Sequence, residues 1–292
     1  MEKKRIEQHI FHLAHCRGIG PISQVRMVAA LVDDQTLTAY QLAQSAHLST
    51  KNKQAFLESY VRIEPERLKK KYAYQNIHWI TILDSHYPEY LKQIYNPPAL
   101  LFYRGDIRLL KNDLLAIVGP RKNTPYGSLV LDQLLPELIK NKIVTVSGLA
   151  KGIDCAVHKK TILLGGKTIA VIGSGLDYSY PYEHKELQKE IGDYHLVLSE
   201  YPIGVKPLPY HFPMRNRLIA GLSLGTLVVE AQNHSGSLIT ANLALQEGRE
   251  VFAVPGPITS PYSQGTNQLI MQGAKCVLTA SDILEEFIFD IK

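Results

Sequence analysis

The stretch Leu114-Leu-Ala-Ile-Val-Gly-Pro-Arg121 joins a run of five apolar residues directly to a glycine turn. No polar residue alternates within the run, so we expect a strand whose two faces are both covered. Further runs of this kind follow, separated by stretches long enough for helices, which favours right-handed crossovers in a mainly parallel sheet. The sequence therefore predicts a doubly wound α/β domain. The further runs are Ile143–Val146, Thr168–Ile172, His195–Leu198, Thr226–Val229, Val251–Val254 and Cys276–Leu278.

The residues before this region follow a different pattern. Apolar residues within Ile6–Leu13 recur at helical spacing, and Thr38 and Pro65 are typical first residues of helices. We therefore expect a small all-helical domain over residues 1–75, followed by the α/β domain over residues 76–292.

The composition is that of a globular protein. Its 292 residues are 45% apolar and 20% charged, and this length suggests about two domains. No apolar run approaches the roughly 18 residues of a membrane span, and Met1–Arg5 leads into a polar segment, so we expect neither a span nor a signal peptide. The three cysteines, Cys16, Cys155 and Cys276, lie far apart, which argues against a disulfide framework or structural zinc and fits a reducing cytoplasm.

The excess positive charge lies at one end of the chain. Residues 1–75 hold 12 Lys or Arg and 7 Asp or Glu, whereas residues 76–292 hold 20 of each. The net charge of +5 therefore comes from the N-terminal quarter. Two interpretations stay open: a solvated basic surface, or a region that attracts a polyanion.

Glycine and polar residues follow several of the predicted strands. These turns are Gly119–Arg121, Ser147–Gly152, Gly173–Asp177 and Ser235–Ser237. Glycine lets the backbone approach a ligand, and the helix start that follows offers free N–H groups that suit phosphate. One such turn is typical of an ordinary helix entry, but several at one edge of a sheet predict an anion site.

Two nucleotide motifs are near-misses. Gly166-Lys167-Thr168 resembles the end of a P-loop but precedes a strand, and Tyr178 stands where a dinucleotide fingerprint starting at Gly173 needs its third glycine. There is also no GxSxG or HExxH motif, and the histidines lack metal-ligand spacing. We therefore expect no ATP, NAD, metal or other cofactor.

Two polar residues receive local interpretations. His158 follows Asp154 by four residues on a predicted helix and is interpreted as a hydrogen-bond partner rather than a general base. Glu230 ends a buried strand and is interpreted as an anchor for loop N–H groups rather than a catalytic group.

The segment from Lys206 to Arg217 mixes aromatic and basic residues. Tyr210 and Phe212 stand beside Lys206, Arg215 and Arg217. Aromatic faces can stack on unpaired bases while cations hold phosphates. A proline-rich loop that leads into a charged helix explains the same residues, so the segment by itself leaves both interpretations open.

Taken in order, these strings resemble the DNA-processing protein A family (DprA, also called Smf). Each motif alone is weak, but the ordered set is specific and covers most of residues 77–280. The strings are Ile117–Arg121, Ser147–Asp154 with His158, Ile172–Asp177 with Tyr180-Pro181, His211–Gly221, Ser235–Ala241 and Gly248–Gly256.

The resemblance implies a function. It implies a cytoplasmic bacterial protein that binds single-stranded DNA, protects incoming strands during natural transformation and helps to load the RecA recombinase onto them. It further implies an extended Rossmann-like domain, self-association as a homodimer or higher oligomer, no membrane contact and no enzymatic activity.

The resemblance also assigns residues. DNA contacts in the family centre on the arginine of a Gly-Ser-Arg turn, here Arg121, although Pro120 replaces the serine and removes a donor. Tyr182 stands where a lysine is common, with Lys185 as a substitute. Together with the motifs, the expected DNA-binding residues are Gly119, Arg121, Lys151, Lys185, Lys206, Phe212, Arg215, Arg217 and Ser237.

Self-association is expected around Leu269 and Ile270, as the apolar centre of a helix surface; ordinary core packing is the alternative. The N-terminal Gly18-Ile-Gly20 resembles a helix-hairpin-helix, which either contacts DNA or only packs.

Two other functions stay open. The first is a Rossmann-like nucleotide phosphoribohydrolase, although Glu230 follows Gly225-Thr226 one residue too late for that motif and its Pro-Gly-Gly is absent. The second is a nucleotide-binding regulator.

Overall fold

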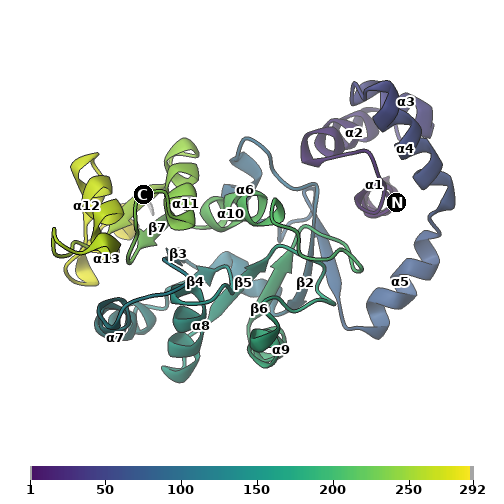
Figure 1. Ribbon diagram of the computed structural model, residues 1–292. Helices are drawn as coiled ribbons and strands as arrows, with labels where there is room; N and C mark the ends of the chain where they lie inside the picture. Colours follow the sequence, from purple (N-terminus) through teal and green to yellow (C-terminus); the bar gives the residue numbers. More distant parts are fainter. Residues whose placement is uncertain (1, 290–292) are drawn as a thin grey trace.

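The computed structural model describes residues 2–289 and contains one mixed sheet with helices on both faces (Figure 1). Its strands are β1 (His78–Thr81), β2 (Leu100–Gly105), β3 (Leu114–Val118), β4 (Val144–Ser147), β5 (Thr168–Ile172), β6 (Leu196–Ser199), β7 (Gly225–Val228), β8 (Glu250–Ala253) and β9 (Lys275–Cys276). They are ordered β1-β2-β6-β5-β4-β3-β7-β8-β9; β1 and β2, and β2 and β6, pair antiparallel, and the other pairs are parallel. The predicted α/β class is confirmed.

Helices cover the sheet and precede it. The N-terminal helices are α1 (Glu2–Ala14), α2 (Pro21–Asp33), α3 (Ala39–Ser45), α4 (Thr50–Arg62) and α5 (Pro65–Tyr74). The later helices are α6 (Glu89–Gln93), α7 (Pro125–Lys140), α8 (Ile153–Leu163), α9 (Lys185–Tyr194), α10 (His211–Leu222), α11 (Gly236–Gln246), α12 (Gln264–Met271) and α13 (Ser281–Phe289). Short 3-10 helices are η1 (Ile107–Lys111), η2 (Tyr182–His184) and η3 (Pro261–Ser263).

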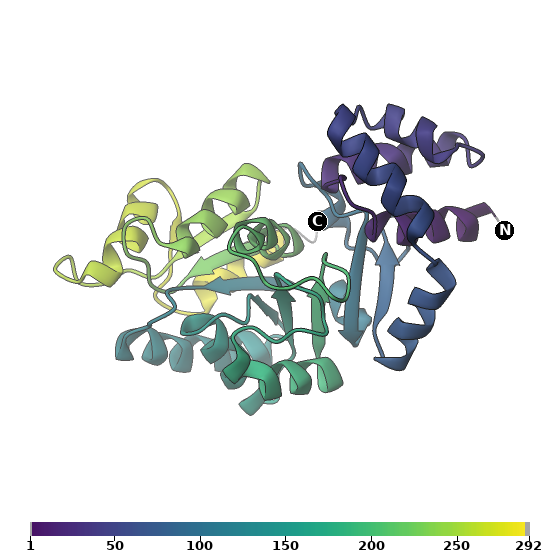
Figure 2. The same ribbon diagram turned by 45° about the vertical axis from the view of Figure 1, so that its right-hand side comes forward.

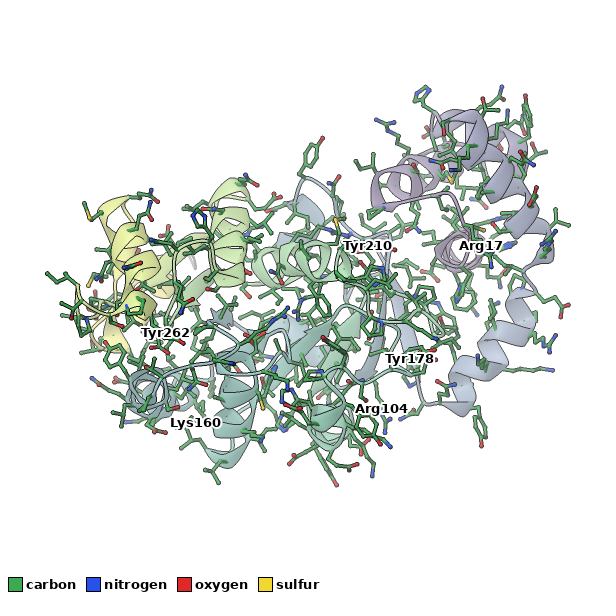
Figure 3. The ribbon with its side chains drawn as sticks, viewed as in Figure 1. Arg17, Arg104, Lys160, Tyr178, Tyr210 and Tyr262 are labelled. Atoms are coloured by element: carbon green, nitrogen blue, oxygen red, sulfur yellow. The ribbon has the colours of Figure 1, made fainter. Side chains whose placement is uncertain are left out.

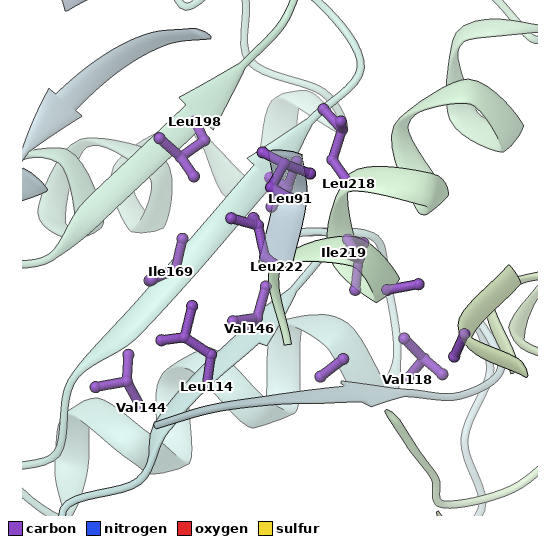
Figure 4. Packing of buried hydrophobic residues seen from close by; sticks show 14 of the residues in the cluster. Leu91, Leu114, Val118, Val144, Val146, Ile169, Leu198, Leu218, Ile219 and Leu222 are labelled. Carbon is purple, nitrogen blue, oxygen red and sulfur yellow. The ribbon is translucent and has the colours of Figure 1, made fainter. Parts of the chain in front are cut away.

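The apolar run of β3 is buried on both faces, as its sequence predicts. Leu115 and Ile117 pack in the core beneath α7 and α8, whereas Leu114 and Val118 pack in the core beneath α10 and α11. Figure 1 shows these helix pairs on opposite sides of the sheet, and Figure 4 shows the second core at close range. Full burial of such a side chain stabilises the fold by about 1.5–3 kcal/mol, which explains why the strand has no polar face.

The strand order reverses beside β3. From β3 the chain moves outward through β4, β5 and β6, and it then returns to place β7, β8 and β9 on the other side of β3. The crossovers after β3 and β7 therefore leave in opposite directions. In sheets of this kind ligands bind in the crevice at this reversal.

The N-terminal helices pack against the β1–β2 edge of the sheet (Figures 1 and 2). Thr38 begins α3 with a capping box, and α5 begins at Pro65, as the sequence predicts. Phe102 of β2 lies in the same core as these helices, and its ring stacks on that of Tyr72 at 5.0 Å. The predicted domain boundary after residue 75 thus falls between elements that share one hydrophobic core. The division into two domains stays a prediction.

Leu269 and Ile270 were expected to form the apolar centre of a helix surface, but the structure places them against the core. Leu269 is only 4% exposed and belongs to the core beneath α11, and Ile270 packs partly buried against that core. The exposed apolar side chains in this part of the chain are instead Ile258, Met271 and Leu278. A helix that closes a sheet turns its apolar residues inward, so the core-packing alternative holds for Leu269.

Within residues 2–289, no helix combines the length and the apolar character that crossing a membrane requires.

Candidate functional site

A cavity of about 700 Å³ opens where the strand order reverses between β3 and β7. It is lined chiefly by the turn after β3, the loop leading into α11, the first part of α10, and Tyr262 of η3. Figure 3 labels Tyr262 on one side of this region and Tyr210 on the other. Segments more than a hundred residues apart in sequence therefore meet at one edge of the sheet.

Five of the residues expected to bind DNA line this cavity. They are Gly119, Arg121, Phe212, Arg215 and Ser237. They come from two of the glycine turns that follow strands and from the separate aromatic and basic segment Lys206–Arg217, and the structure brings these three motifs together.

The other expected DNA-binding residues lie elsewhere. Lys151 lines a smaller hollow next to the cavity, whereas Lys185 and Lys206 are exposed and line neither space. Arg217 is buried, forms an ion pair with Glu200 and donates to the carbonyl oxygen of Asn96. Arg217 was expected to contact DNA, but in the structure its guanidinium is held within the fold by this ion pair and does not line the cavity.

The turn that carries Arg121 is held by the start of α8. The N–H of Ile153 donates to the carbonyl oxygen of Pro120 over 3.2 Å. The guanidinium of Arg121 stays exposed along the cavity, with its Cζ 5.8 Å from the centre of the Phe212 ring. A guanidinium can form two hydrogen bonds with a phosphate, and the neighbouring ring can stack on a base.

The residues after Arg121 are held by Glu230, just beyond β7. Its Oε2 accepts from the N–H of Thr124 over 3.0 Å, and its Oε1 accepts from the hydroxyl of Thr124 over 2.6 Å. Glu230 is 2% exposed, and a Cβ on Gly127 would come within 2.3 Å of its Oε2. The interpretation of Glu230 as a loop anchor is confirmed.

Arg215 supports the turn after β4 from below. It is 5% exposed and its Nη1 donates to the carbonyl oxygens of Gly148 and Val171. Burial raises the pKa of the Asp154 carboxyl, and the positive charge of Arg215 counteracts this rise. Because two of its hydrogen bonds go to backbone carbonyls, Arg215 shapes the cavity wall as well as adding charge to it.

The comparisons with known proteins agree with this geometry. A sequence model of the DNA recombination-mediator protein A family matches residues 78–288. The chain belongs to this family. It is 48% identical to the DNA processing protein DprA of Streptococcus pneumoniae, over 82% of this chain and 84% of the relative, and 39% identical to the protein Smf of Escherichia coli, over 89% and 72%.

Two solved structures of family members resemble this one. The crystal structure of DprA from Streptococcus pneumoniae has a TM-score of 0.87 at 42% identity and covers 97% of both chains. A structure of DNA processing protein A from Helicobacter pylori, described by its single-stranded DNA binding mode, has a TM-score of 0.65 at 33% identity. It covers 73% of this chain and 97% of that one. The Rossmann-like fold of the family is thereby shown for this chain.

The charges around the cavity of this family member favour an anion. Arg121, Lys122 and Arg215 line it, against the single carboxylate of Asp154 among the described lining residues. The first residues of α11 also line it, and their N–H groups add a partial positive charge.

His158 is the other polar residue that received a local interpretation from the sequence. His158 is fully buried and its Nδ1 lies 2.7 Å from the hydroxyl of Thr168, so its interpretation as a hydrogen-bond partner is confirmed, with Thr168 rather than Asp154 as the observed partner. In the part of the chain from residue 2 to residue 289, no three His, Cys, Asp or Glu side chains are grouped so that they could hold a metal.

Two aromatic residues that line the cavity, Tyr180 and Tyr262, were not predicted to bind DNA. Tyr180 could have been found, because the pair Tyr180-Pro181 accompanies the family string Ile172–Asp177. No sequence pattern points to Tyr262. Its position depends on a hydrogen bond with a distant residue, because its carbonyl oxygen accepts from the N–H of Ala231 over 2.8 Å.

Proposed function

We propose that this protein binds single-stranded DNA in the cavity between β3 and β7, and that it does so without catalytic turnover. In the cell it would protect incoming strands during natural transformation and help to load RecA onto them. Its cytoplasmic location and its self-association as a homodimer or higher oligomer belong to the same proposal.

One observation carries the proposal: the exposed guanidinium of Arg121 stands beside the ring of Phe212 in a cationic cavity. The ring can stack on a base only if that base is unstacked from its neighbours, which favours single strands over duplex. The Helicobacter pylori relative, whose structure is described by its single-stranded DNA binding mode, supports this choice of ligand.

The proposal is tested by fluorescence anisotropy with labelled oligothymidylate and with a duplex of the same length at fixed salt. We expect the single strand to bind more tightly. If three or four phosphates are neutralised, the slope of log K against log salt is about −2 to −3. Equal affinity for the duplex would overturn the proposal.

The phosphoribohydrolase alternative depends on Glu230 as a reacting group. Both carboxylate oxygens of Glu230 already accept hydrogen bonds from Thr124, and the side chain is 2% exposed. We therefore expect no hydrolysis of AMP. Turnover of AMP that disappears in Glu230→Gln would favour the enzyme instead.

Replacing Phe212 by alanine is expected to weaken binding to oligothymidylate about tenfold, since stacking contributes about 1–3 kcal/mol per base. The salt slope should stay nearly unchanged, because the ring neutralises no phosphate. The control is Phe212→Tyr, which keeps an aromatic face and should retain most of the affinity. A large change of slope in Phe212→Ala would contradict the stacking role.

A further inference from the structure

A smaller hollow of about 60 Å³ lies next to the cavity. The two spaces share Arg121, Tyr180, Phe212 and other lining residues, so they adjoin each other. The rings of Tyr180 and Phe212 have centres 5.3 Å apart and planes inclined by 38°. Tyr180 lines both spaces, so a strand in the cavity that passes Phe212 meets Tyr180 at the boundary with the smaller hollow.

The chain beyond Tyr180 presents a second exposed ring. Tyr182 at the start of η2 is 78% exposed, and Tyr180 is 49% exposed. The ammonium of Lys185, the first residue of α9, lies 5.9 Å from the centre of the Tyr182 ring. Figure 3 labels Tyr178 at the start of this loop. An exposed aromatic face beside an exposed cation has the chemistry that binds one unpaired nucleotide, with the base on the ring and the phosphate on the cation.

One of the cations that line the small hollow, Lys151, is paired with a carboxylate, whereas Arg121 and Arg215 line it as well. Lys151 lines the hollow, and its Nζ lies 2.9 Å from Oε2 of Glu183. Both side chains are more than half exposed, so the pair is weak and a phosphate can replace the carboxylate. Glu183 belongs to the same short helix as Tyr182, so the competing carboxylate and the exposed ring come from one segment.

We propose that Tyr180 and Tyr182, with Lys151 and Lys185, form a second stacking subsite for the nucleotides that continue from the cavity along the same DNA strand. Without DNA the carboxylate of Glu183 forms an ion pair with Lys151, and a DNA phosphate displaces that carboxylate on binding. This inference rests on the proposed function, because it extends the path of the strand that the cavity holds.

A series of oligothymidylates from about two to about ten nucleotides, measured by anisotropy competition, tests the subsite. For the wild type, affinity should rise as the strand grows beyond the cavity. In Tyr182→Ala this rise should shrink about tenfold for the longer strands, while the shortest strands that bind should be unaffected. Tyr182→Trp should restore the rise, which a merely structural role would not require.

The matched control is Tyr194→Ala, which removes another exposed tyrosine, 71% exposed, from the far end of α9. It should leave the whole length series unchanged. The two failures are distinguishable: if the wild type binds no oligonucleotide, the proposed function is wrong. If the wild type binds but the length dependence of Tyr182→Ala equals that of the wild type, only the subsite is overturned.

Glu183→Gln tests the competition for Lys151. Removing the carboxylate should strengthen binding of the longer strands about two- to fivefold and steepen the salt slope by up to about 0.7, because in the wild type the displaced carboxylate takes up a cation and offsets part of the cation release from the DNA. Glu186→Gln removes the same charge from an exposed neighbour in the first turn of α9 and is the control. Equal effects of the two changes would reduce the role of Glu183 to net charge and overturn this part of the proposal.

Discussion

Replacing Arg121 by alanine is expected to lower the affinity for single-stranded oligonucleotides about ten- to a hundredfold. The guanidinium is exposed along the cavity beside Phe212 and can hold a phosphate with two charge-assisted hydrogen bonds, each stronger than a neutral one. Pro120 leaves its turn one backbone donor short, so the side chain carries more of the contact. Loss of one phosphate contact should also flatten the salt slope by about 0.7.

The comparison for Arg121→Ala is Arg108→Ala. Arg108 is an arginine in η1 whose side chain is 81% exposed and does not line the cavity, so its loss should leave affinity and slope unchanged. Both variants should melt like the wild type, because neither guanidinium is buried. Normal binding by Arg121→Ala, or a loss of binding that only follows unfolding, would disprove the assignment.

Strands were predictable where both faces are buried. The bounds expected for β3 and β5 agree with the structure, in which every residue of both strands is buried. Those of β4, β6, β7 and β8 are shifted by one residue. Strand ends depend on the neighbouring strand's register, such as the pairing of Thr145 with Thr168, and a single sequence does not encode this visibly.

The glycine turns were predictable as a group, because the carboxyl ends of parallel strands must lie at one edge. The prediction did not distinguish which of the two arginines of α10 faces the cavity, although helix geometry makes that distinction possible. Residues two apart on a helix point to nearly opposite sides, so Arg215 and Arg217 cannot both face the cavity. Phe212 and Arg215, three apart, share a face and both line it. Arg217 instead pairs with Glu200 on the other side.

The positions of Leu269 and Tyr262 were not predicted correctly because they depend on residues that are distant in sequence. Leu269 has the pattern of an amphipathic helix, but which side is covered depends on α11 and β8. Tyr262 reaches the cavity only because its loop is hydrogen-bonded next to β7. Neither fact follows from local periodicity.

The backbone beneath Arg121 should tolerate substitution even less than its side chain. Gly152 precedes α8 with φ +74°, and a Cβ there would lie 2.2 Å from the carbonyl oxygen of Pro120 and 2.6 Å from the carbonyl carbon of Arg121. Both are backbone atoms, which cannot rotate away. In Gly152→Ala the turn must move, so we expect a loss of about 2–4 kcal/mol in the free energy of unfolding from strain and overpacking.

Gly165 is a comparison position at the other end of α8 where an added Cβ meets no collision. It has the same φ of +74°, but no atom lies within 4 Å of the position of its Cβ. Gly165→Ala should therefore lose only about 1 kcal/mol, the cost of a left-handed alanine, and bind oligothymidylate normally. Denaturant unfolding measures both stabilities, and anisotropy at a temperature where both variants are folded measures binding. Gly152→Ala should then bind more than tenfold more weakly than Gly165→Ala, because the displaced turn carries Arg121. Equal affinities of the two folded variants would show that the position of this turn does not control the DNA site.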